Sequence, residues 1–196
     1  MSSGHPGLTN TFLEKGSPFK WSDQNLTEIE TIKSKYPDER IQSAVMPLLY
    51  LAQKQNDNWL SVECIDLISQ TLNMPKIRVA EVASFYSMFN LKPVGKNLIQ
   101  ICRTSPCWLR GSNKITKTIC DETDCDINQT SDDGLFTVVE VECLGACSNG
   151  PMIQINDEFF EDLNHKNTKQ IIDNIKNNKP NKVGSQTGRS SSENAK

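Results

Sequence analysis

Two short cysteine pairs are the residues of this sequence best suited to chemistry. The first pair lies in Cys102-Arg-Thr-Ser-Pro-Cys107 and the second in Cys143-Leu-Gly-Ala-Cys147. Each pair follows an apolar run typical of a buried strand, at residues 98–101 and 136–141. Because each pair starts a loop at the end of a strand, the four thiols can converge on one small volume. Four thiols in one volume indicate either a bound metal or two disulfides.

The spacing of the pairs favours an iron–sulfur cluster, with zinc, disulfides and free thiols as the alternatives. Structural zinc sites are dominated by shorter spacings such as Cys-x2-Cys, which neither pair shows. Iron–sulfur clusters also take four thiolates, and they tolerate longer loops because two irons share the ligands pairwise. The 35 residues between the pairs, 108–142, have room for a helix and a strand. This separation is unlike the ligand loop of a plant-type ferredoxin, and it favours a cluster held between two loops.

Length, charge and hydropathy limit the class of protein. The 196 residues can form one good-sized domain or two small ones. The net charge of −3, with interspersed lysines, argues against a nucleic-acid-binding surface, which needs a basic stripe. No apolar run approaches the roughly 18 residues that span a bilayer, so we expect a soluble or peripheral protein with no direct membrane span.

The first ten residues indicate whether the protein is exported, and export decides whether its cysteines meet an oxidising or a reducing environment. They have neither a charged start nor an apolar core, so we expect no secretory signal. They also lack the arginines of a mitochondrial transit peptide, although a cleaved form would look the same. Without export, the seven cysteines lie in a reducing compartment, where disulfides are rare.

The first half of the chain is predicted to be helical. Residues 1–20 are expected to be an irregular arm, because glycine and proline recur there. Ser22 and Ser61 are predicted N-caps, and Pro47 is expected to kink a helix. Residues 21–92 thus form a predicted helical bundle. Apolar residues at helical spacing place its helices at about 22–36, 39–53, 61–72 and 75–88.

After Pro93 and Gly95 the pattern changes to strands. The order of the predicted elements indicates an α/β domain of thioredoxin-like layout over residues 96–178. The segment 179–196 is rich in serine, asparagine and glycine, which predicts a disordered tail. The predicted elements are a strand at 98–101, a helix at 108–119, a strand at 136–143, a hairpin at 152–160 and a helix at 168–176.

Several segments resemble one protein family along most of the chain, about residues 20–176. Together they resemble the small [2Fe–2S] subunit of the NADH dehydrogenase module of respiratory complex I, the proton-pumping NADH:quinone oxidoreductase. The same family is used in NAD-linked hydrogenases and formate dehydrogenases. The segments that carry the resemblance are Ser43–Leu49, Gln53–Gln55 with Trp59, Arg78–Phe89, Pro106–Ser112, Gly134–Thr137 and Val141–Cys147.

The resemblance implies a fold, a cofactor and partners. The fold is an N-terminal helical bundle followed by a thioredoxin-like α/β domain that holds one [2Fe–2S] cluster. The cluster and metal ligands that it implies are Cys102, Cys107, Cys143 and Cys147, the same four thiols that stood out by spacing. The implied partners are a flavoprotein subunit that binds FMN and NADH, and further iron–sulfur subunits of the peripheral arm. The implied location is peripheral, on the cytoplasmic side of the bacterial inner membrane, or on the mitochondrial matrix side if the source is eukaryotic.

The sequence is compatible with three functions. The first is the electron-transfer subunit of NADH:quinone oxidoreductase, which carries single electrons and is not catalytic alone. The second is the equivalent diaphorase subunit of a soluble NAD-linked hydrogenase or formate dehydrogenase. The third is a free-standing, zinc-stabilised interaction domain, which the resemblance disfavours.

Seven residues outside the two pairs also carry expectations. Cys64 and Cys120 are interpreted as apolar core residues, although Cys120 forms a further Cys-x4-Cys pair with Cys125. Arg103 and Arg110 either soften the negative charge of the cluster, or they face solvent or pair with the partner subunit. A further expectation concerns the fourth helix, where an interface with a partner or a contact between the two domains is expected at Phe85, Met88 and Phe89.

Overall fold

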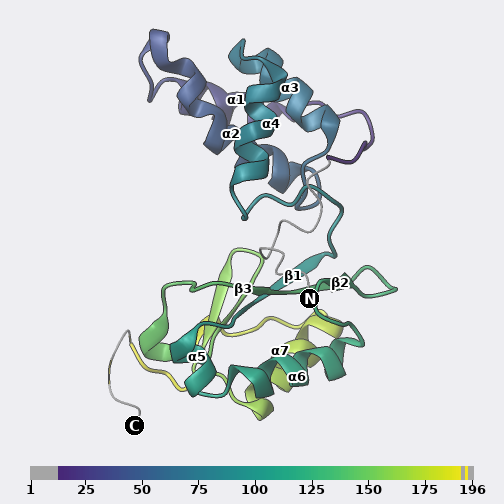
Figure 1. The fold of residues 1–196 in the computed structure, drawn as a ribbon, viewed down its shortest axis with the longest axis vertical. Helices are drawn as coiled ribbons and strands as arrows, with labels where there is room; N and C mark the ends of the chain where they lie inside the picture. The colour runs from purple at the N-terminus through teal and green to yellow at the C-terminus, as the bar shows by residue number, and fades with distance from the viewer. Residues whose placement is uncertain (1–12, 191–192, 194–196) are drawn as a thin grey trace. The chain divides into compact units, whose positions relative to one another are not determined.

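The computed structural model describes residues 13–190 and 193. The chain divides into two compact units, Met1–Val94 and Gly95–Lys196 (Figure 1). Of the expected N-terminal arm, residues 13–20 contain neither helix nor strand, and residues 1–12 lie outside the described residues. Within the described part of the chain, no helix combines the length and apolarity that a membrane span requires.

The first unit is built from helices. Ser22 and Ser61 are N-caps as predicted, since the Ser22 hydroxyl accepts from the N–H of Asn25 and the Ser61 hydroxyl accepts from the N–H of Cys64. The elements, in chain order, are α1 (Asp23–Lys33), the 3-10 helix η1 (Asp38–Ala44), α2 (Val45–Gln55), α3 (Val62–Leu72) and α4 (Lys76–Phe85).

The predicted helix at 39–53 is two elements rather than one kinked helix. The 3-10 helix η1 is interrupted at Arg40, which has φ −122°, and α2 begins only at Val45. Pro47 therefore lies in the first turn of α2, where its missing N–H costs no helical hydrogen bond. The expected kink at Pro47 is thus wrong: the break falls before the proline.

The core of the first unit is formed by buried residues of α1, α2, α3 and α4. Cys64 is fully buried in this core, which confirms its predicted packing role. Phe89 is also buried there and lies 5.1 Å from Tyr50, centroid to centroid, so its expected place at an interface is wrong. The chain leaves the helix after Phe85, which turns Phe89 inward and leaves Phe85 and Met88 exposed.

The second unit is one six-stranded sheet with α6 and α7 packed against one face (Figure 1). The strand order is β2-β3-β1-β4-β5-β6, with β1 parallel to β3 and antiparallel to β4. The predicted hairpin is confirmed by the antiparallel pair β4 and β5. The elements are β1 (Asn97–Cys102), α5 (Ser105–Leu109), α6 (Ser112–Thr123), β2 (Gln129–Thr130), β3 (Phe136–Val141), the 3-10 helix η2 (Cys147–Asn149), β4 (Ile153–Ile155), β5 (Glu158–Glu161), α7 (His165–Lys176) and β6 (Gly184–Ser185).

Two predictions for this unit need correction. The helix predicted at 108–119 is broken into α5 and α6 at Gly111, whose φ of +94° is not helical. The prediction of a disordered tail over 179–196 is wrong for residues 184–190. Gly184 and Ser185 form β6, which pairs parallel to the end of β5. Backbone and polar side-chain hydrogen bonds hold this segment, so its low apolar content is no guide to its order.

Candidate functional site

The four predicted cysteines lie on two loops at one edge of the sheet. Cys102 is the last residue of β1, and Cys107 follows within α5. Cys143 comes two residues after the end of β3, and Cys147 begins η2. Since β1 and β3 are parallel neighbours, with Cys102 paired to Val141, both loops leave the sheet at the same edge. The sheet register therefore positions the two pairs side by side.

The four thiols interact with one another. The sulfurs of Cys143 and Cys147 are 3.2 Å apart. The neighbouring Cys102 thiol helps to raise the pKa of Cys107 and to lower the pKa of Cys143, and the Cys147 thiol also helps to raise the pKa of Cys107. Cys102 and Cys107 are buried, whereas Cys143 and Cys147 are exposed. The structure thus brings together two pairs of sulfur donors, one inside the protein and one at its surface.

The surroundings of these sulfurs suit a negatively charged group. Backbone N–H groups and glycines lie close to the sulfurs, so the backbone can come near such a group. Gly145 has φ +90°, which favours glycine, and its N–H donates to the sulfur of Cys143 at 3.4 Å. A Cβ at Gly150 would lie only 3.1 Å from the sulfur of Cys107. Sulfur donors in two pairs, with N–H groups near them, are what a [2Fe–2S] core takes. Among residues 13–190 and 193, no group of three or more His, Cys, Asp or Glu side chains is placed to hold a single metal ion.

The acidity of the thiols differs between the two pairs. Burial, together with the neighbouring Cys102 thiol, raises the pKa of Cys107 to about 12. The N–H of Gly145 and the thiol of Cys147 lower the pKa of Cys143 below its ordinary value. The hydrogen bond with Cys143, and then burial, raise the pKa of Cys147. The exposed Cys143 thiol therefore releases its proton more readily than the buried Cys107 thiol.

This order of pKa values predicts the reactivity of the cluster-free chain. The thiolate is the nucleophile, so iodoacetamide at pH 8 is expected to modify Cys143 first and to leave Cys107 unmodified until the protein unfolds. Mass spectrometry of peptides from an alkylation time course measures the order. Denatured protein, in which all cysteines react at similar rates, is the control. Modification of Cys107 ahead of Cys143 in folded protein contradicts the described pKa order.

The cysteines outside the site have packing roles. Cys125 is buried in the core of the second unit, and its thiol donates to the carbonyl oxygen of Gln129 at 3.0 Å. Cys120 is half-buried against the same core, which confirms the predicted packing role. Burial raises the pKa of both thiols.

The two arginines near the first pair face solvent. The guanidinium of Arg103 forms an ion pair with Glu140 at 3.3 Å, and Arg110 is exposed. The structure therefore supports the alternative that both arginines face solvent. The pattern of the sequence did not point to Thr104, whose hydroxyl lies 3.3 Å from the sulfur of Cys102. It also did not indicate the polar contacts that hold the loop after Cys147. These contacts join Asn149 to Glu161 and Arg189 to Ser148, and such residues are far apart in the sequence.

The sheet, the two helices on its face and the sulfur donors at one edge define a thioredoxin-like α/β protein with a four-thiol site. The profile of the family described as thioredoxin-like [2Fe-2S] ferredoxin matches residues 29–176, and this chain belongs to that family. The match confirms the predicted fold class and the [2Fe–2S] cluster as the cofactor of the family.

Two relatives are closely similar in sequence. The mitochondrial NADH dehydrogenase [ubiquinone] flavoprotein 2 of Dictyostelium discoideum is 47% identical over 177 residues, which is 90% of this chain and 72% of that protein. An NADH-quinone oxidoreductase subunit of Rickettsia bellii is 49% identical over 159 residues, which is 81% of this chain and 95% of that protein. The resemblance to the small subunit of the NADH dehydrogenase module is thereby confirmed.

A solved structure shares the fold. A chain of an NAD+-reducing [NiFe]-hydrogenase in its H2-reduced state superposes with a TM-score of 0.60 at 22% identity. The superposition covers 68% of this chain and 23% of the hydrogenase chain, so this chain spans about a quarter of that protein's length.

Proposed function

We propose that this chain is the electron-transfer subunit of an NADH:quinone oxidoreductase, with one [2Fe–2S] cluster bound by Cys102, Cys107, Cys143 and Cys147. The observation that carries the proposal is the meeting of four thiols beyond the ends of β1 and β3, in a chain of a [2Fe–2S] family. The names of the two relatives, at 47% and 49% identity, support an NADH dehydrogenase as the host complex.

The residues of the site have separate roles in this proposal. When bound, the cluster accepts and releases one electron at a time. Cys102 and Cys107 hold the buried side, where little water reaches the sulfurs. Cys143 and Cys147 hold the exposed side, which a partner can approach. The N–H of Gly145 donates to the sulfur of Cys143 and so offsets part of the negative charge of the thiolates.

The partners and location follow from the same proposal. The electron donor is the FMN of a flavoprotein subunit that binds NADH, and further iron–sulfur subunits of the peripheral arm accompany it. The chain is then a peripheral subunit on the cytoplasmic side of a bacterial inner membrane, or on the matrix side of a mitochondrial one. The alternative host is a soluble NAD-linked hydrogenase or formate dehydrogenase. The shared fold supports this alternative, but at a lower identity of 22%.

Purification of the intact complex tests the proposal. A tagged chain isolated anaerobically from solubilised membranes is expected to bring FMN and other iron–sulfur subunits with it. Addition of NADH is then expected to reduce quinone in a complex that retains this chain. Isolation of the chain with hydrogenase or formate dehydrogenase subunits supports the alternative host. A chain that purifies without flavin from every fraction contradicts both.

A further inference from the structure

The segment from Gly184 to Arg189 is folded onto the end of β5. Gly184 pairs with Phe160 and Ser185 pairs with Glu161 in a short parallel ladder. The ladder continues beyond β6, since the N–H of residue 186 donates to the carbonyl oxygen of Glu161 at 3.0 Å. The backbone therefore delivers Arg189 to a fixed place beside the sheet.

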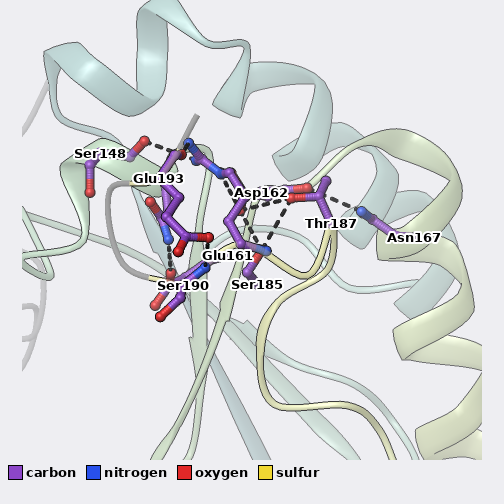
Figure 2. Close-up of polar contacts among 10 residues, drawn as sticks. Ser148, Glu161, Asp162, Asn167, Ser185, Thr187, Ser190 and Glu193 are labelled. Carbon is purple, nitrogen blue, oxygen red and sulfur yellow. Dashed lines mark hydrogen bonds and ion pairs between the residues drawn. The ribbon is translucent and has the colours of Figure 1, made fainter. Parts of the chain in front are cut away.

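Arg189 forms a buried ion pair with Asp162, the residue after β5. The two side chains are 9% and 5% exposed. The Nε of Arg189 donates to Oδ2 of Asp162 at 3.1 Å, and its Nη2 donates to Oδ1. The hydroxyls of Ser185 and Thr187 also donate to Oδ2, at 2.6 and 3.2 Å (Figure 2). Two parallel N–H donors on one carboxylate fix the guanidinium in a single orientation.

The charge state of Asp162 is consistent with this arrangement. Burial by itself raises the pKa of Asp162, but the hydrogen bonds from Arg189 and Ser185 outweigh it and hold the pKa below its ordinary value. The carboxylate is therefore ionised at neutral pH, and the pair is held by charge-assisted hydrogen bonds.

The same guanidinium reaches the second cysteine loop. Nη2 of Arg189 donates to the carbonyl oxygen of Ser148 at 3.0 Å, and Ser148 directly follows Cys147 (Figure 2). This hydrogen bond joins two segments that are 41 residues apart in the chain.

Further hydrogen bonds hold the rest of the loop against the end of β5. The N–H of Asp162 donates to the carbonyl oxygen of Asn149 at 2.7 Å, and the N–H of Leu163 donates to that of Pro151 at 3.0 Å. The side-chain amide of Asn149 donates to Glu161 at 2.7 Å. Hydrogen bonds to Glu161, Asp162 and Leu163 therefore hold Asn149 and Pro151 in place. Arg189 holds Ser148, the residue next to Cys147.

We propose that Arg189 is a positioning residue for the cluster, which acts by fixing the loop that carries Cys143 and Cys147. The proposal rests on the ligand assignment made under the proposed function. These two cysteines are exposed, so packing does little to immobilise their sulfurs. An anchor directly after Cys147 restricts the loop and slows the departure of the thiolates from iron. Residues that orient ligands in this way affect metal retention without contacting the metal.

The test compares full-length, anaerobically purified chains. The variants are Arg189→Met, which removes both the charge and the two parallel N–H donors, and Arg189→Lys, which retains the charge alone. Lys182→Met is the matched control, because Lys182 is an exposed cation two residues before this segment. Iron release to a chelator is followed well below the melting temperature, and the EPR spectrum of the reduced protein is recorded for each. Arg189→Met is expected to speed iron release by about ten- to a hundredfold. It is also expected to shift or broaden the EPR signal.

The outcomes are distinguishable. Arg189→Lys is expected to restore the wild-type behaviour only in part, because an ammonium cannot make the two parallel bonds. A lower melting temperature with unchanged iron release and EPR spectrum overturns the positioning role. A wild-type chain without a [2Fe–2S] cluster overturns the proposed function instead.

A second variant covers the case in which Arg189→Met does not fold. The double variant Arg189→Met, Asp162→Leu removes both charges, so neither is left buried and unpaired. It lacks the hydrogen bond to Ser148 and is expected to release iron as fast as the single variant. Release at the wild-type rate from the folded double variant overturns the proposal.

Discussion

Serine in place of Cys107 is expected to abolish the [2Fe–2S] signal of this chain or to shift it strongly. A serine hydroxyl is a harder and far less acidic donor than a thiol, so it holds iron poorly. Cys107 is 1% exposed, so the hydroxyl would also be buried without the iron that the proposed function places on the sulfur. Replacement of Cys102, Cys143 or Cys147 is expected to have the same direction of effect. Iron and sulfide content and the EPR spectrum of the reduced protein are the measurements.

Cys120→Ser is the matched control for these substitutions. Cys120 belongs to a pair with the same Cys-x4-Cys spacing, but it packs against the core of the second unit. It is expected to retain a full complement of iron and the wild-type spectrum. An unchanged spectrum in any of the four ligand variants contradicts the assignment of that cysteine. Loss of the cluster from folded Cys120→Ser contradicts the conclusion that Cys120 has a packing role and does not bind the cluster.

Alanine in place of Phe136 is expected to lower the free energy of unfolding of the second unit by about 3–5 kcal/mol. Phe136 is 1% exposed and is the first residue of β3, the strand that lies between β2 and β1. Its ring packs in the core between the sheet and α6 and α7, so truncation leaves a cavity among side chains from several elements. Urea unfolding under anaerobic conditions, followed by circular dichroism, measures the change.

Phe85→Ala is the control for this prediction. Phe85 is 78% exposed at the end of α4, and its truncation is expected to change the free energy of unfolding by less than about 0.5 kcal/mol. A loss below about 1 kcal/mol for Phe136→Ala contradicts the described core.

The elements that position the site were predictable because their signals are local. The apolar runs before each cysteine pair become β1 and β3, and their parallel pairing explains why the two loops meet. The N-caps Ser22 and Ser61 were predictable for the same reason, because a cap depends on residues three positions away.

The features that sequence patterns missed depend on residues far apart in the chain. Arg189 lies 27 residues from Asp162 and 41 from Ser148, and no periodicity connects these polar side chains. Their segment has few apolar residues, so composition predicted disorder where hydrogen bonds supply order. Phe89 was misplaced for a related reason. The chain leaves the helix after Phe85, and helical spacing no longer describes where a later side chain points.

The proposed function depends on the presence in this chain of one [2Fe–2S] cluster that accepts a single electron. Iron and sulfide analysis of the anaerobically purified chain, together with EPR after dithionite reduction, tests it most directly. The expected result is two irons and two sulfides per chain, with the rhombic signal of one unpaired electron. Zinc without sulfide in a stably folded sample would contradict it and would leave a structural module in place of an electron carrier.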